Sequence, residues 1–124
     1  MEVLFSINKK RQFTIEEARS LLPVIYRITE DSQKELRFLV NRIEALKGSQ
    51  PLLISELENE ISKLVDRWNS KIEKLGGTPK GVWLADFDSG KGYYCWKFPE
   101  NDIKFHHGYQ DGFSGRVSIE SLDS

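Results

Sequence analysis

Residues 73–87, "EKLGGTPKGVWLADF", mark the point at which the sequence changes from helical spacing to strand-like spacing. The pair Gly76–Gly77 is typical of a helix C-terminus, and Thr78–Pro79 cannot readily continue a helix. The run "GVWLADF" that follows is short, apolar and aromatic, as strands are. The chain is therefore expected to combine an N-terminal helical part with a C-terminal sheet, which is the α+β class.

Upstream of Gly76 the apolar residues recur every three or four positions, which predicts two amphipathic helices. Thr14 and Glu17 have the spacing of a capping box at the start of the first helix. The segment "KGSQP" at 47–51 separates the helices, so residues 14–75 are expected to form an antiparallel hairpin. The apolar positions are Ile15, Ala18, Leu22, Ile25, Leu36, Leu39, Ile43 and Leu46, then Ile54, Leu57, Ile61, Leu64, Trp68, Ile72 and Leu75.

The apolar stripes of this hairpin can be covered by each other, by the sheet or by a second copy of the chain. Thr29 and Ser32 interrupt the first stripe at core positions. Because the hairpin is long relative to the rest of the chain, we expect self-association through it, as a homodimer.

Downstream of Gly76, "GVWLADF", "YYCWKF" and "IKFHH" read as strands, and "DSGKG" and "PEND" read as turns. They predict a small antiparallel meander over residues 81–119 that packs on the hairpin, within one domain spanning 1–124. "RVSI" at 116–119 and "VLFSI" near the start are candidates for further strands.

Counting the loops as five and four residues sets a register for this sheet. Asp86 is then opposite Tyr94, and Tyr94 is opposite His107, on a face that is otherwise apolar. We expect that face to pack on the hairpin, which would make the row Asp86–Tyr94–His107 the polar rim of a pocket. On the other face, Cys95 would lie opposite His106.

This rim suits a small polar or anionic ligand, and the candidate binding residues are Asp86, Tyr94, His107, Asp111 and Arg116. His107 can donate or accept a hydrogen bond, Tyr94 can orient a ligand, and Arg116 can bind a carboxylate or phosphate with two bonds. In the alternative interpretation, Asp86 binds Arg116 or His107 in a purely structural network.

A metal site would have to use Asp86, His107, Asp111 or Cys95, but the sequence has no CxxC or HxxxH spacing. Adjacent histidines on a strand point to opposite faces, so only one of them can bind a given ion. We therefore predict no metal and no cofactor.

Catalysis is left open by the sequence. A small hydrolase or transferase could use His107 as acid and base, together with Asp86 or Cys95. A non-catalytic binding or assembly module is the preferred interpretation, with Cys95 as a small packing residue.

Composition excludes several classes of partner. The 124 residues include 18 Lys and Arg and 19 Asp and Glu, for a net charge of -1. That balance predicts no nucleic-acid or membrane partner. No apolar run is long enough to cross a bilayer, and the single cysteine favours a reducing, cytoplasmic location.

Several of these stretches together resemble an uncharacterised, mostly bacterial family known only as a domain of unknown function, the 2203 family. They are "FTIEEARSLLP" at 13–23, "ADF" at 85–87, "CW" at 95–96 and the stretch from His107 to Arg116. The resemblance implies an α+β domain and implies no activity. Position 106 is usually a large aromatic in that family, so the resemblance favours His107 over His106 as a functional residue and weakens the Cys95–His106 pairing.

Overall fold

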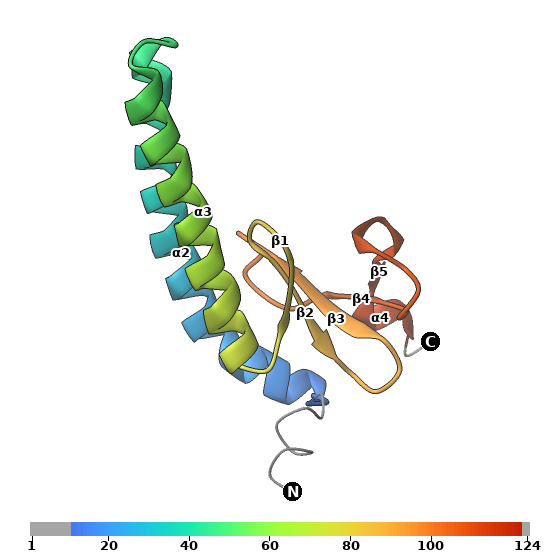
Figure 1. Ribbon diagram of the computed structural model, residues 1–124. Helices are drawn as coiled ribbons and strands as arrows, with labels where there is room; N and C mark the ends of the chain where they lie inside the picture. The colour runs from blue at the N-terminus through green and yellow to red at the C-terminus, as the bar shows by residue number, and fades with distance from the viewer. Residues whose placement is uncertain (1–10, 123–124) are drawn as a thin grey trace, which may run out of the picture.

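The computed structural model describes residues 11–122, and Figure 1 shows a long helix pair followed by a small sheet. The predicted α+β arrangement, a helix hairpin followed by an antiparallel sheet, is confirmed. The candidate strand "VLFSI" lies outside the described residues. The elements are α2 (Ile15–Leu46), α3 (Pro51–Lys74), β1 (Thr78–Gly81), β2 (Leu84–Asp88), β3 (Tyr93–Lys97), β4 (Phe105–His107), the 3-10 helix η1 (Phe113–Gly115), β5 (Val117–Ser118) and α4 (Ile119–Leu122).

The start of α2 is fixed by the predicted capping box. Glu17 N donates to Thr14 Oγ1 over 3.1 Å, and Thr14 N donates to Glu17 Oε1 over 2.8 Å. These bonds satisfy two backbone N–H groups that would otherwise lack a partner. No helix in the described part of the chain is both long and apolar enough to pass through a membrane.

The two polar residues in the helix seam are buried and hydrogen-bonded. Thr29 is fully buried, accepts a bond of 2.8 Å from Trp68 Nε1 and donates one of 2.6 Å to the Ile25 carbonyl. Ser32 donates to the Ile28 carbonyl over 2.8 Å. Both interruptions of the apolar stripe are therefore satisfied, Thr29 by a polar contact between α2 and α3 and Ser32 by a bond within α2.

The sheet has the antiparallel order β1-β2-β3-β4-β5. It begins at Thr78 and not at residue 81 as predicted, because Pro79 is tolerated on an edge strand. The predicted strand "GVWLADF" is shorter than expected and starts at Leu84, since Trp83 has a left-handed backbone with φ 62° and forms part of the turn. The candidate strand at 116–119 is present as β5, Val117–Ser118.

The predicted register is wrong by one residue at both hairpins. Asp88 pairs with Tyr93 around the turn 89–92, so Asp86 is opposite Cys95 and not Tyr94. Asp88 is the last residue of β2 and is not part of the turn. Its side chain stabilises the turn by accepting a hydrogen bond from Gly90 N. The loop between β3 and β4 runs from residue 98 to 104, which is longer than "PEND", so Tyr93 and not Tyr94 is opposite His107.

The two errors cancel in their effect on side-chain direction. Side chains alternate between faces, and the two shifts together preserve the parity between β2 and β4. Asp86 and His107 therefore share a face, as predicted, and Cys95 joins them. The predicted pairing of Cys95 with His106 is wrong, since Cys95 is opposite Phe105.

The prediction that the Asp86 face packs on the hairpin is also wrong. The opposite face does so, through Ala85, Phe87 and Trp96, all fully buried. The ring centroid of Phe87 lies 5.4 Å from that of Phe13, which comes just before α2. The ring centroid of Trp96 lies 6.4 Å from that of Tyr26 on α2. Because these large rings cover the hairpin, the Asp86 face points away from the helices.

Candidate functional site

A pocket of about 220 Å³ lies on the face of the sheet that points away from the hairpin. Strands β1 to β4 supply most of its lining, and the segment that follows β4 supplies the rest. The lining residues are Lys80, Leu84, Asp86, Tyr93, Cys95, His107, Tyr109, Asp111, Gly112 and Phe113. A larger groove of about 490 Å³ lies between α2 and residues 101–102. The side chains of its Arg19–Asp102 ion pair are each almost half exposed. We therefore take the smaller pocket, whose polar residues are buried, as the candidate functional site.

Asp86 and His107 form the buried polar part of this pocket, with 2% and 4% of their surfaces exposed. His107 Nε2 lies 3.0 Å from Asp86 Oδ2, although β2 and β4 are separated by β3. Cys95 on β3 is opposite Asp86, and its small side chain leaves room for the two larger groups to meet above it.

The contacts of His107 fix which of its nitrogens bears a proton. Nδ1 lies 2.9 Å from the backbone oxygen of Gly108. A carbonyl oxygen only accepts, so Nδ1 must be the protonated nitrogen. Nε2 then faces a carboxylate oxygen, and these two groups can share a proton or another cation.

The second carboxylate oxygen of Asp86 is less well satisfied. Oδ1 is buried and accepts no hydrogen bond of ordinary geometry from residues 11–122. The Cys95 thiol interacts with the carboxylate, but S–H is a weak donor. A buried charged acceptor in this state is energetically costly.

The Cys95 thiol is fully buried, and burial is the main reason that its pKa is raised to about 12. The negative charge of Asp86 and the contact between the thiol and that carboxylate raise the pKa further, while Arg116 opposes the shift. The thiol is therefore protonated at neutral pH and is a poor nucleophile. Its sulfur, one Asp86 oxygen and one His107 nitrogen all lie within 4.8 Å of one another.

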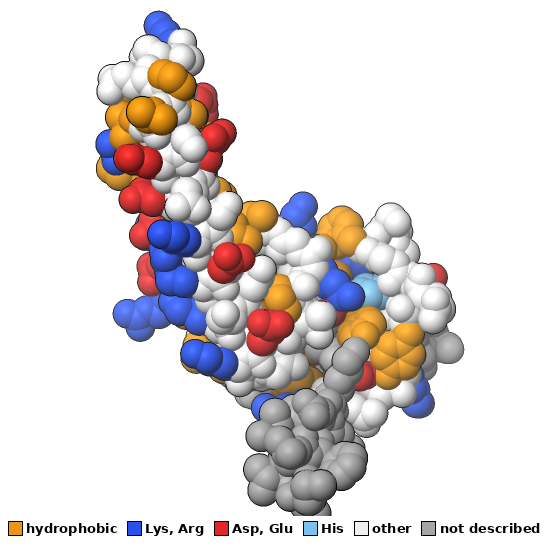
Figure 2. All heavy atoms as spheres, viewed as in Figure 1, with side chains coloured by type: hydrophobic (Ala, Val, Ile, Leu, Met, Phe, Trp, Pro, Cys, Tyr) orange, Lys and Arg blue, Asp and Glu red, His pale blue; other side chains and the backbone are white. Residues whose placement is uncertain are grey.

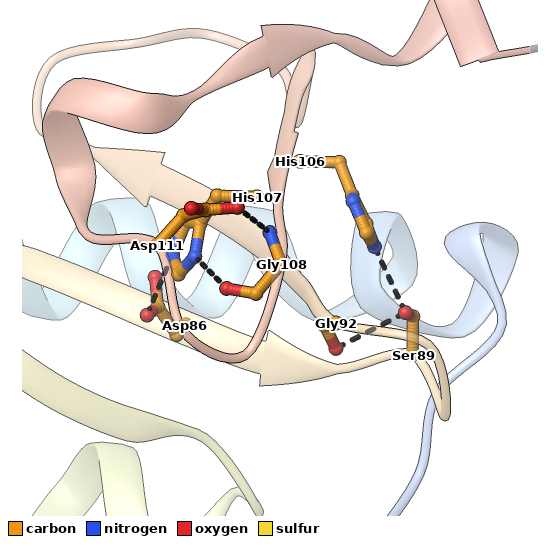
Figure 3. A network of polar contacts seen from close by, with 7 residues as sticks. All are labelled: Asp86, Ser89, Gly92, His106, His107, Gly108 and Asp111. Carbon is orange, nitrogen blue, oxygen red and sulfur yellow. Dashed lines mark hydrogen bonds and ion pairs between the residues drawn. The ribbon is translucent and has the colours of Figure 1, made fainter.

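His106 belongs to a different environment from His107. Figure 3 shows the two imidazoles on opposite sides of β4. His106 Nε2 lies 3.0 Å from Ser89 Oγ, and its ring packs edge-on against Tyr94 with 5.6 Å between centroids. Burial, and then the neighbouring His107, lower the pKa of His106.

Asp111 closes the pocket on its outer side. Its Oδ2 accepts a bond of 3.2 Å from Gly108 N, as Figure 3 shows. A Cβ on Gly108 would lie only 2.7 Å from that oxygen, so any other residue at position 108 would make the Asp111 side chain shift.

Neither of the other two predicted residues lines the pocket, although Arg116 interacts with the Cys95 thiol. Tyr94 is on the hairpin face. Arg116 donates to both carboxylate oxygens of Glu100, over 3.1 and 2.9 Å, and stacks between Phe105 and Phe113 at 4.1 Å from each ring. Of the predicted set, the pocket thus brings together Asp86, His107 and Asp111.

Seven of the ten lining residues were not among the predicted binding residues, and Cys95, Tyr93 and Lys80 are three of them. Cys95 and Tyr93 were missed because the predicted register placed them on the other face, and the correct turn at 89–92 would have identified both. Lys80 was missed because β1 was not predicted.

Fold and pocket together define the class: a small α+β domain in which a helix hairpin covers one sheet face and leaves a polar pocket on the other. The chain belongs to the family described as "Uncharacterized conserved protein (DUF2203)", whose model matches residues 11–119. The matched region includes every pocket residue, and it confirms the resemblance noted from the sequence. No curated protein and no solved structure matches the chain.

Proposed function

We propose that this protein is a binding module whose pocket takes a small ligand that brings a cation or a hydrogen-bond donor to Asp86. The observation that supports this most is the buried Asp86 Oδ1, which accepts no hydrogen bond from the described residues. An unsatisfied buried acceptor costs about 1–3 kcal/mol or more. A ligand with a donor or a positive charge removes that cost, and this supplies a driving force for binding.

The charges of the pocket favour such a ligand over an anion. The anionic interpretation depended on Arg116, whose guanidinium is already bonded to Glu100. Asp86 and Asp111 are both acidic, while Lys80 is the single basic residue among the lining residues apart from histidine. The proposed ligand is therefore small, polar and cationic or donor-bearing.

The alternative of a hydrolase or transferase is less well supported. His107 has its carboxylate partner at 3.0 Å, but the imidazole is 4% exposed and its Nδ1 is bonded to backbone. The raised pKa of the Cys95 thiol disfavours a thiolate nucleophile. We therefore propose binding without a reaction, in the reducing, cytoplasmic compartment that suits a free thiol.

Binding to the pocket is testable by amide NMR on the full chain with two small probes. Ethanolamine carries a cationic donor group and acetate carries only acceptors. Ethanolamine should shift the amides of Tyr93, Cys95 and Gly112, and acetate should not. The shifts should be lost in Asp86→Asn and kept in the control Asp66→Asn, which alters an exposed acid on α3. Shifts caused equally by acetate, or unchanged in Asp86→Asn, would overturn the proposal.

We also propose that the hairpin mediates self-association. The hairpin extends well past the sheet, and Figure 2 shows apolar side chains on its surface towards the far end. Phe38 on α2 is 60% exposed and Leu52 on α3 is 82% exposed. Light scattering at micromolar concentration should give a dimer mass that falls in Phe38→Ser/Leu52→Ser, and a monomer mass for the unaltered chain would contradict this proposal.

A further inference from the structure

We propose that Asp86, Cys95 and His107 bind a transition-metal ion at the buried end of the pocket, and that Zn²⁺ is the ion they suit best. The inference rests on the proposed function, because it identifies the cation that the pocket would take. It replaces the prediction, made from residue spacing, that no metal is bound.

The spacing of the three ligand atoms fits one ion. The Asp86 oxygen, the Cys95 sulfur and the His107 nitrogen lie within 4.8 Å of one another, and all three residues are buried. Ligand atoms of a tetrahedral zinc site lie roughly 3.3–3.8 Å apart, given metal–ligand bonds of roughly 2.0–2.3 Å. Small side-chain rotations would therefore be enough to close the three atoms around a metal.

His107 has the orientation that a metal ligand needs. Its Nδ1 proton is fixed by the Gly108 carbonyl at 2.9 Å, so Nε2, which faces Asp86, is the nitrogen left to bind a metal. Metal-binding histidines are commonly held in this way by an acceptor on the nitrogen that does not bind the metal. In the metal-free chain a proton shared by Nε2 and Oδ2 accounts for their contact at 3.0 Å, and a metal ion would take the place of that proton.

Asp86 provides an independent indication of a cation. Its Oδ1 is buried and has no hydrogen-bond partner among residues 11–122, while Oδ2 faces His107. A divalent cation coordinated by this carboxylate would neutralise its charge and relieve the cost of burial. No other residue in the described chain offers Oδ1 a conventional donor.

The ligand types select the class of metal. A thiolate prefers Zn²⁺ and other soft or borderline ions over Mg²⁺ and Ca²⁺, which take oxygen ligands. With Asp86 and Cys95 ionised and His107 neutral, the ligands contribute two negative charges and balance a divalent ion. The metal and its three ligands would therefore carry no net charge, which is favourable in a buried position, although the Arg116 guanidinium also interacts with the Cys95 thiol.

The site would leave one coordination position for a ligand from outside the chain. Three protein ligands and one open position are the arrangement of zinc sites that bind water or a small molecule. The pocket of about 220 Å³ adjoins all three residues, and Tyr93 and Tyr109 line it. A fourth ligand can therefore reach the metal from the pocket.

The test uses the full chain, freed of metal with a chelator and titrated with Co²⁺ as a spectroscopic substitute for Zn²⁺. A thiolate bound to Co²⁺ gives a charge-transfer band in the near ultraviolet, and tetrahedral Co²⁺ gives strong visible bands. We expect saturation at one ion per chain and displacement by an equal amount of Zn²⁺. Each ion bound should also release protons, because the thiol must ionise.

Variants assign the spectrum to the three residues. Cys95→Ser, which changes little in size, should abolish the charge-transfer band, and His107→Gln should weaken Co²⁺ binding by more than about tenfold. The matched control is His106→Gln, which alters the adjacent histidine on the other face and should bind Co²⁺ normally. Amide NMR spectra confirm that each variant is folded.

Absence of a saturable band, or a band that survives in Cys95→Ser, would overturn the inference. If ethanolamine still shifts the pocket amides of the metal-free protein, the proposed function stands without the metal. If neither Co²⁺ nor ethanolamine binds, both proposals are wrong.

Discussion

The imidazole of His107 meets the carboxylate of Asp86 across an intervening strand, with 3.0 Å between Nε2 and Oδ2. The two residues belong to β4 and β2, and β3 lies between them. Cys95 is the β3 residue opposite Asp86, and it is small enough to permit the contact. The contact and the residue beneath it thus form one buried polar unit.

The two residues of this contact should be energetically coupled. Asp86→Ala and His107→Ala should each lower the free energy of unfolding by roughly 3 kcal/mol, because each leaves a buried polar group without its partner. The double variant should cost less than the sum of the two. Urea unfolding in the presence of a chelator measures this coupling, and additive effects would show that the contact is absent in solution.

The Cys95 thiol should make stability depend on pH in the alkaline range. Its pKa is about 12 in the folded chain, against an ordinary value of 9.0, so the unfolded chain loses this proton first as the pH rises. Its contribution to stability is complete below pH 9.0 and is lost between there and about pH 12. Urea unfolding of the metal-free protein, measured in the presence of a chelator as a function of pH, should show this decline.

The matched variant for this titration is Cys95→Ser. Lysines and tyrosines also titrate in this range, so the informative quantity is the difference in slope between the two proteins. Stability should fall more steeply with pH in the unaltered chain. Equal slopes would contradict a buried, protonated thiol.

The buried hydroxyl of Thr29 should stabilise the helix pair. Thr29→Val keeps the shape of the side chain but leaves Trp68 Nε1 without its acceptor at 2.8 Å. We expect a loss of about 1–3 kcal/mol in unfolding free energy. Ser32→Ala is the comparison, because that hydroxyl bonds only to the carbonyl of its own helix in the contacts described, and it should cost less than about 1 kcal/mol. A Thr29→Val variant as stable as the unaltered chain would show that the Trp68 bond contributes nothing.

Arg116 should act as a structural residue. Its guanidinium binds both oxygens of Glu100 and stacks between two phenylalanine rings, and its side chain is 14% exposed. Arg116→Ala should therefore lower the free energy of unfolding by about 2 kcal/mol. Arg116→Lys should restore little of this, because lysine cannot reproduce the planar paired contact.

The control for Arg116 is Arg67→Ala, whose partner is Glu35. Both of those side chains are more than half exposed, so the loss should be below about 1 kcal/mol. A different result would support anion binding by Arg116, as the sequence first suggested. In that case acetate would shift the pocket amides of the unaltered chain, and Arg116→Ala would abolish those shifts while lowering the free energy of unfolding as little as Arg67→Ala does.

The elements of the fold could be predicted largely from local signals, while the register could not. Capping by Thr14 and Glu17, the apolar spacing and Gly76–Gly77 determine the hairpin within a few residues. The sheet register depends on turn details that spacing does not reveal, such as the side chain of Asp88 bonding to Gly90 from within the strand. An error of one residue in the predicted register put Tyr94 opposite Asp86, where the structure has Cys95.

The candidate site was predicted in part for the same reason. Asp86 and His107 were placed on one face because two register errors cancelled, and Asp111 follows closely in the chain. Arg116 was assigned to the pocket because its partner Glu100 lies in a different loop, and sequence spacing does not show that the two meet. Asp86, Cys95 and His107 were named as possible metal ligands, but the sequence favoured no metal, because the three residues come from three separate strands and have no short-range motif.

A single cation site formed by Asp86, Cys95 and His107 beneath the pocket, as proposed, should be visible by diffraction. Its most direct test is a crystal structure of the protein grown with Zn²⁺, with an anomalous difference map recorded at the zinc absorption edge. We expect a peak roughly 2.0–2.3 Å from a carboxylate oxygen of Asp86, the sulfur of Cys95 and Nε2 of His107. A map with no peak there, in which His107 and Asp86 remain in direct contact and nothing approaches Oδ1, would contradict it.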